Sequence, residues 1–260
     1  MQLSEDHWDS DILIWPEFAL TLYGQDAVAV TDLLNRRGES SQTNVVIGMP
    51  DVQWQDQERY QVFNSAQGFG QASGKFAKYH LVPFGDYVPL QHYLRGFIEF
   101  FDLPMSNASR GARQQANIVL TLSGQDQPVE VAAGICYEIA YGDSLRRQAE
   151  TSGLLLTISN DTWFGGTIGP HQHMQIAQMR ALENGRWLLR GTNNGVTGIV
   201  NPRGEITAQL SQFEPNVLRG EFEVMAGFTP YSRLGDIPAL ILLAILLVVS
   251  ALRSLRRNFS

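Results

Sequence analysis

Residues 129–138 read Val-Glu-Val-Ala-Ala-Gly-Ile-Cys-Tyr-Glu, and this stretch decides the fold. Residues 129–135 are almost entirely apolar and follow the polar segment 123–128, so the sequence predicts a hairpin turn and then a buried strand. Beyond Gly142 a helix is expected. Cys136 therefore falls on a strand-to-helix turn, where a nucleophile lies beside backbone N–H donors. The simpler alternative is an inert buried cysteine.

Similar apolar runs recur along the chain, and helical periodicity separates several of them. Helices are predicted from Ala27 to a closing Gly38, over residues 144–151, and from Pro170 to about Arg190. Further strands are predicted at residues 12–15, 44–49, 60–66, 117–123, 154–159, 196–200, 205–210 and 217–222. Alternating strands and helices predict an α/β fold.

The composition narrows the classes of function. The 260 residues are 44% hydrophobic and 17% charged, which is typical of one large folded domain. A net charge of -7 without a basic run argues against a nucleic-acid partner. Cys136 is the single cysteine, so no intrachain disulfide can form. His171 and His173 are not accompanied by a third metal ligand, and we expect neither a metal nor a cofactor.

The C-terminal region carries a membrane signal. Residues 237–252 are apolar except for Pro238 and Ser250, and three arginines follow at 253, 256 and 257. Such a run would span about 24 Å as a helix, somewhat less than the hydrocarbon core. Flanking arginines favour the cytoplasm, which would place residues 1–236 on the outer side. A buried core helix is the alternative. The N-terminus shows no signal peptide.

Two charged residues have side chains suited to work with Cys136. Glu17 follows the apolar run 12–15, and a buried carboxylate there is a candidate general base. The alternative is a glutamate at a helix N-terminus. Lys78 precedes an apolar, proline-rich loop, and a solvated surface lysine is its ordinary interpretation.

Together, Glu17, Lys78 and Cys136 occur in the chain order of the catalytic Glu, Lys and Cys of the nitrilase (carbon-nitrogen hydrolase) superfamily, which the sequence resembles. The likeness is closer to its apolipoprotein N-acyltransferase branch and covers nearly the whole chain from Asp11 onward. The motifs that carry it are Ile-Trp-Pro-Glu at 14–17, Lys78 with His-Leu-Val-Pro-Phe-Gly at 80–85, Gly-Ile-Cys-Tyr-Glu at 134–138, Asn-Asp-Thr-Trp-Phe-Gly at 160–165, Gly-Pro-His-Gln-His at 169–173 and Arg-Ala-Leu-Glu-Asn-Gly-Arg at 180–186.

The resemblance implies an architecture. A nitrilase-like four-layer α-β-β-α sandwich is expected over residues 1–232, followed by one C-terminal transmembrane helix and a basic cytoplasmic tail over residues 233–260. It also implies a transmembrane bundle, and the first strand and helix of the domain, ahead of residue 1. The sequence is therefore expected to be a fragment or a truncated gene product.

The resemblance also implies a reaction. Glu17 would take the proton of Cys136 as the thiol attacks an acyl ester of a membrane phospholipid, and Lys78 would stabilise the oxyanion. The thioester would then acylate the α-amino group of the N-terminal diacylglyceryl-cysteine of an apolipoprotein. The expected location is the bacterial inner membrane, with the catalytic domain on the periplasmic side. The chain is expected to be monomeric.

Further pocket residues follow from the same resemblance: Asp86, Pro89, Tyr137, Glu138 and Trp163. Asp86 stands where the family commonly has glutamate, so its reach toward the site is an open question at this point.

Two other functions stay open. A nitrilase-type amidase would use the same three residues to hydrolyse a small C–N substrate, and an inactive truncated remnant would keep them without activity. The membrane tail and an apolar stretch over residues 94–105 favour the acyltransferase, if that stretch dips into the outer leaflet and is not an ordinary packed helix.

Overall fold

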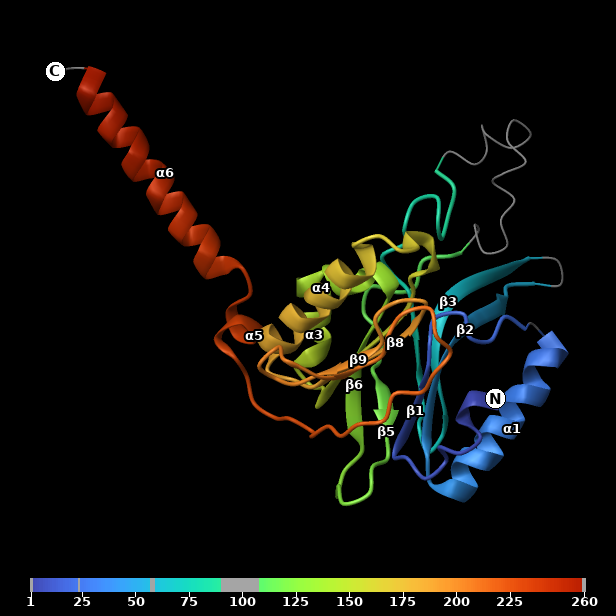
Figure 1. Ribbon diagram of the computed structural model, residues 1–260. Coiled ribbons are helices and arrows are strands. Elements are labelled where there is room, and N and C mark those ends of the chain that lie inside the picture. Colours follow the sequence, from blue (N-terminus) through green and yellow to red (C-terminus); the bar gives the residue numbers. More distant parts are fainter. Residues whose placement is uncertain (1, 23, 57–58, 90–107, 259–260) are drawn as a thin grey trace.

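The computed structural model describes residues 2–22, 24–56, 59–89 and 108–258 (Figure 1). Two β-sheets pack face to face. The first has the strand order β1-β2-β3-β4, in which β1 and β2 are parallel and the other neighbours antiparallel. Its strands are β1 (Ile12–Trp15), β2 (Asn44–Trp54), β3 (Tyr60–Gly70) and β4 (Lys75–Ala77).

The second sheet has the order β10-β9-β8-β7-β6-β5, and its centre, β6 to β8, is parallel. The antiparallel pairing of β5 with β6 confirms the hairpin predicted at residues 123–128. The strands are β5 (Ile118–Leu120), β6 (Val129–Ile135), β7 (Leu154–Asn160), β8 (Leu188–Asn193), β9 (Gly198–Val200) and β10 (Ile206–Gln209).

Alternation along the strands builds the layers. On β7, Leu154, Leu156 and Ile158 pack between the two sheets, whereas Leu155 faces the helices on the outer side. Those helices are α3 (Gly142–Ala149) and α4 (Gly169–Asn184), and α1 (Gly24–Ser41) covers the first sheet (Figure 1). Short 3₁₀ helices are η1 (Gln2–Ser4), η3 (Cys136–Ala140) and η4 (Thr162–Phe164). The predicted four-layer α-β-β-α sandwich is confirmed.

Three predictions of element bounds were wrong. The helix expected from Pro170 to Arg190 ends at Asn184, because Gly185 adopts a left-handed conformation (φ +61°) and the chain turns into β8. Residues 217–222 pair with no strand in the described part of the chain. Gly38 does not end α1, which continues to Ser41. The position requires glycine because the backbone of Gly70 packs against it, and a Cβ at Gly38 would lie only 2.7 Å from Gly70 Cα.

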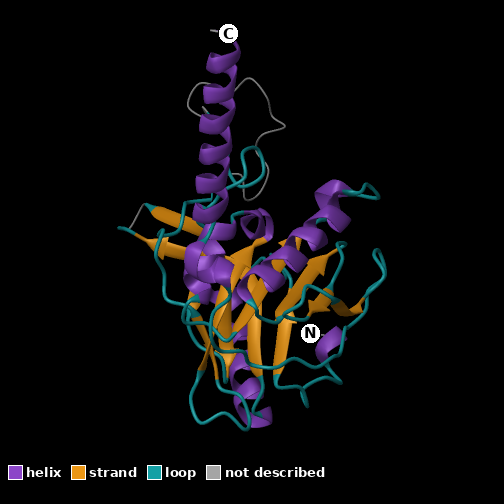
Figure 2. Ribbon diagram, turned by 90° about the vertical axis from the view of Figure 1, so that its left-hand side faces the viewer, coloured by secondary structure: helices purple, strands orange, loops and turns teal. Residues whose placement is uncertain are grey.

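The C-terminal helix stands apart from the sandwich. After α5 (Pro230–Leu234), α6 (Ile237–Asn258) projects away from the sheets (Figures 1 and 2). Its window Ile237–Ser254 has a mean hydropathy of 2.4, and none of it is buried. At 22 residues it measures about 33 Å, longer than the apolar run alone suggests. By length and composition it can cross a membrane.

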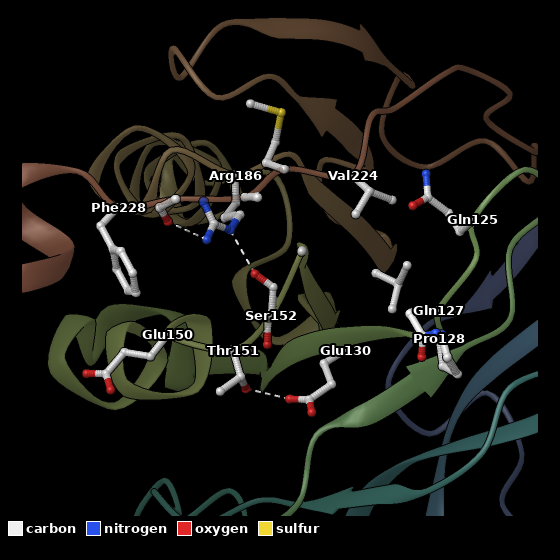
Figure 3. Close-up of a pocket in the computed structure, with 15 residues that line it drawn as sticks. Gln125, Gln127, Pro128, Glu130, Glu150, Thr151, Ser152, Arg186, Val224 and Phe228 are labelled. Atoms are coloured by element: carbon white, nitrogen blue, oxygen red, sulfur yellow. Dashed lines mark hydrogen bonds between the residues drawn. The ribbon is translucent and has the colours of Figure 1, made fainter.

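Arg186 anchors the segment that leads to α6. Its guanidinium is buried and donates to the carbonyls of Ser152 and Gly227 at 2.8 Å each, and more weakly to those of Asn184 and Gly185 (Figure 3). This cluster lines a pocket at the start of β6, the end of that strand remote from Cys136. The pocket is therefore separate from the site described below.

Replacing Arg186 with Met should destabilise the chain by about 3 kcal/mol, because several buried carbonyls lose their donor. Thermal unfolding in detergent and limited proteolysis of residues 211–229 measure the effect. Arg203→Met is the matched control, since its side chain is 77% exposed and pairs only with Glu205 at the surface. Equal melting temperatures for the two variants would contradict the anchoring role.

Candidate active site

Strand directions bring the three predicted residues to neighbouring sheet edges. β2 is parallel to β1, and β3 is antiparallel to both β2 and β4, so β4 runs in the same direction as β1. Lys78 and Glu17, which follow these two strands, therefore lie at one edge of the first sheet. Cys136 follows β6 directly, at the carboxyl end of the parallel centre of the second sheet. Packing of the two sheets then brings these edges together. Glu17 and Lys78 accordingly both act on the pKa of Cys136.

A buried ion cluster forms the centre of the site. The Lys78 ammonium lies 3.3 Å from Glu17 Oε1 and 2.8 Å from Asp86 Oδ2, and its side chain is 2% exposed. Asn64, from the middle of β3, donates from Nδ2 to Glu17 Oε1 at 2.7 Å and to Asp86 Oδ1 at 3.3 Å. Asp86 is also fixed by the Val82 N–H. The shorter aspartate therefore reaches Lys78 directly.

The cluster keeps Lys78 protonated. Burial by itself lowers the pKa of Lys78, but the charges of Glu17 and Asp86 oppose burial, and this pKa lies above its ordinary value. A fixed ammonium in a site of low dielectric is suited to stabilise an oxyanion. It is not suited to accept a proton near neutral pH.

Glu17 is seated by two hydrogen bonds from the second sheet. Its Oε2 accepts from the Asn160 N–H at 2.7 Å, and its carbonyl accepts from Asn193 Nδ2 at 2.8 Å. Gly48 makes room for it, because a Cβ there would lie 2.4 Å from the Pro16 carbonyl and 2.5 Å from Glu17 Cα. Glu17 is 3% exposed, and these contacts fix the direction of its carboxylate.

Cys136 has the conformation of a strained turn. Its φ of +55° is unfavourable for a residue with a side chain, by roughly 1–2 kcal/mol. Burial, and next the charge of Glu17, raise the pKa of the Cys136 thiol to about 12, against the opposing charge of Lys78. The resting thiol is therefore protonated at neutral pH, and its attack needs a base.

Glu138 ties the cysteine turn to the lysine segment. Its Oε1 accepts from the Tyr79 and His80 N–H groups at 2.8 and 3.0 Å, and its Oε2 accepts from the Ile135 N–H at 3.0 Å. Burial raises the pKa of Glu138 to about 7, although these hydrogen bonds oppose the rise. Glu138 thus acts on Cys136 and Lys78 through their chain neighbours.

The remaining predicted pocket residues, Tyr137, Trp163 and Pro89, are more exposed than the buried cluster. Tyr137 is 49% exposed and meets the Tyr141 ring edge to face, and Tyr141 stacks on His80. Trp163, on η4, is 69% exposed, and Pro89 is half-buried where the described segment ends. The apolar stretch predicted at residues 94–105 lies outside the described residues. In the described ranges, no three His, Cys, Asp or Glu side chains are arranged to hold a metal ion.

Sequence reasoning assigned no role to several residues that position the site. Asn64 bridges the two carboxylates, and Asp161, His173 and Arg190 form a buried network behind Cys136. Two signals were available. Asn64 is a polar residue in the middle of a predicted strand, and Asp161 follows β7 at the same sheet edge as Cys136.

Comparisons with known proteins show which family this chain is similar to. The family model for carbon-nitrogen hydrolases matches residues 3–228. The apolipoprotein N-acyltransferase of Pseudomonas paraeruginosa is 44% identical over 229 residues, which cover 88% of this chain and 44% of that protein. The apolipoprotein N-acyltransferase of Vibrio vulnificus is 39% identical over 266 residues, which cover 98% of this chain and 51% of that protein. The chain thus spans about half the length of these curated relatives.

Among solved structures, a carbon-nitrogen hydrolase from Helicobacter pylori has a TM-score of 0.59 at 15% identity, covering 82% of this chain and 78% of that one. At this identity the likeness concerns the fold alone. The two-sheet sandwich, the matched family model and the identity to curated relatives together lead to one conclusion: the chain belongs to the carbon-nitrogen hydrolase family.

Proposed function

We propose that this chain forms the catalytic portion of an N-acyltransferase, which moves a fatty acyl group from a membrane phospholipid to the N-terminal diacylglyceryl-cysteine of apolipoproteins. The observation that carries the proposal is a protonated thiol at a strained turn beside a buried carboxylate and lysine pair. The identity to proteins named apolipoprotein N-acyltransferase selects this acceptor from the reactions that such a site can catalyse.

In the first half-reaction, Cys136 is the nucleophile. Glu17 takes the thiol proton as Sγ attacks the carbonyl carbon of the phospholipid ester, and the ammonium of Lys78 stabilises the oxyanion. When this oxyanion collapses, the C–O bond breaks and the lysophospholipid oxygen leaves with the proton from Glu17. An acyl thioester on Cys136 and an ionised Glu17 remain.

In the second half-reaction, an amine replaces the thiol. The neutral α-amino group of the diacylglyceryl-cysteine attacks the thioester carbonyl, Glu17 accepts a proton from the nitrogen, and the C–S bond breaks. The proton returns to the Cys136 sulfur, and the products are an amide and the original enzyme. Asp86 and Asn64 support both steps because they hold Lys78 and Glu17 in place.

The proposal includes a place in the membrane. Residues 1–232 are assigned to the catalytic domain and residues 233–260 to the anchor. Supporting this division, the family match ends at residue 228 and the apolar surface of α6 is uncovered. The arginines at 253, 256 and 257 orient the C-terminus toward the cytoplasm and the catalytic domain toward the periplasm.

The first test is a search for the thioester. The chain in detergent, mixed with a phospholipid labelled in its acyl group, should gain the acyl mass on Cys136 by intact mass spectrometry, and hydroxylamine should remove it. The adduct forms because the lysophospholipid leaves before an amine arrives. Cys136→Ala should gain nothing. An adduct of the same size on both proteins, or on neither, would contradict the proposal.

A second prediction concerns the pH dependence of the free thiol. Because the Cys136 pKa rises from 9.0 to about 12, alkylation by iodoacetamide should keep accelerating, about tenfold per pH unit, beyond pH 9. The chain unfolded in urea should instead level off above about pH 10, one unit above the ordinary thiol pKa. At pH 7.5 the folded chain should react at least about 100-fold more slowly. A rate that levels off by about pH 10 in the folded chain would refute this assignment.

A further inference from the structure

Behind Cys136 lies a second charged unit, made of Asp161, His173 and Arg190. Asp161 Oδ2 accepts from Arg190 Nη2 at 2.8 Å, and Asp161 Oδ1 lies 3.0 Å from His173 Nδ1. The other ring nitrogen, His173 Nε2, lies 3.0 Å from the backbone carbonyl oxygen of Cys136. All three side chains are at least nine-tenths buried.

The contacts of His173 fix the orientation of its ring. A backbone carbonyl can only accept, so Nε2 is the nitrogen that donates to Cys136. Burial alone would raise the pKa of Asp161, but the hydrogen bond from His173 and the charge of Arg190 outweigh burial and lower this pKa, so Asp161 is ionised. Its carboxylate lies against Nδ1 and so holds the ring with Nε2 toward the Cys136 carbonyl. Arg190 pairs with Asp161 from the other side, and the Phe164 ring meets His173 edge to face.

The hydrogen bond to the Cys136 carbonyl connects this network to the proposed nucleophile. A left-handed conformation at a residue with a side chain persists only where its surroundings impose it. Glu138 holds the Ile135 N–H on one side of Cys136, and His173 holds the Cys136 carbonyl on the other. The two contacts together fix the peptide group that follows Cys136 and the one that precedes Ile135.

We propose that His173 is a positioning residue that joins Asp161 to the carbonyl of Cys136 and so holds the nucleophile in its strained turn. The inference concerns the same site as the proposed acyl transfer and rests on that function for its effect on turnover. Its structural content, the hydrogen bond from His173 Nε2 and the fixed turn, does not depend on the reaction.

The direct test reads the hydrogen bond itself. Nitrogen NMR of the 260-residue chain in detergent, with labelled histidine, should show one histidine whose Nε2 proton exchanges with water far more slowly than that of free histidine, and His173→Gln should remove this signal. A His173 Nε2 proton that exchanges as fast as in free histidine would overturn the proposal whether or not the enzyme turns over.

The functional test separates position from binding. His173→Gln should slow thioester formation by about 100-fold at saturating phospholipid with an unchanged KM, because the nucleophile is displaced and not the lipid. It should also slow Cys136 alkylation at pH 7.5. His171→Gln, two residues away on an exposed position of α4, should leave both rates unchanged.

The outcomes separate the two proposals. Wild type that forms no thioester refutes the acyl transfer, while the NMR signal and the alkylation rate still test His173. Wild type that forms the thioester, with His173→Gln reacting at the same rates, refutes the positioning role alone. Should His173→Gln fail to fold, the exchange rate of the Nε2 proton in the wild type decides the question.

Discussion

The site depends on one buried cation. Lys78 places an ammonium where only 2% of its side chain reaches solvent, and a charge in that position is tolerated only when it is paired and fully hydrogen-bonded. Glu17 and Asp86 supply the pairing, and Asn64 holds both carboxylates in register. Loss of Lys78 would leave two buried carboxylates without their counter-charge, and breaking a buried ion pair generally costs about 3–5 kcal/mol. The same cluster therefore stabilises the fold and prepares an oxyanion site.

The sandwich matters because it assembles the whole site, including Cys136, from two sheets. Glu17 and Lys78 come from the first sheet and Cys136 from the second, and hydrogen bonds cross between them. Glu138 accepts from N–H groups next to Lys78, and Glu17 accepts from the N–H of Asn160. A shift between the sheets would break these contacts together. The packed leucine and isoleucine side chains between the sheets thus also keep the reacting groups at fixed distances.

Much of this architecture could be predicted from the sequence because strands and helices differ in apolar period. Prediction failed where a pattern fits both. Residues 188–190 extend the helical pattern of α4, and only the left-handed Gly185 ends it and allows β8 to form. Residues 217–222 have strand-like alternation but gain no partner strand. The resemblance indicated the residues at which chemistry is proposed, whereas Asn64 and His173 act through contacts between distant segments that no local pattern records.

The proposed function combines a thioester mechanism with substrates in a membrane. A protonated thiol beside a seated carboxylate suits acyl transfer in general, and the uncovered helix α6 with its following arginines suits work on lipids. What distinguishes an acyltransferase from a hydrolase is the group that accepts the acyl chain. Water and an amine compete for one thioester, so the choice between them defines the function.

The most direct measurement is a single-turnover chase of the labelled acyl-Cys136 enzyme with a synthetic peptide that begins with diacylglyceryl-cysteine. The account predicts that the label moves to the α-amino group of this peptide, faster than it is lost to water, and that a peptide with a blocked amine does not accelerate its loss. Release of the label as free fatty acid, at one rate with and without the peptide, would contradict the account and identify a hydrolase.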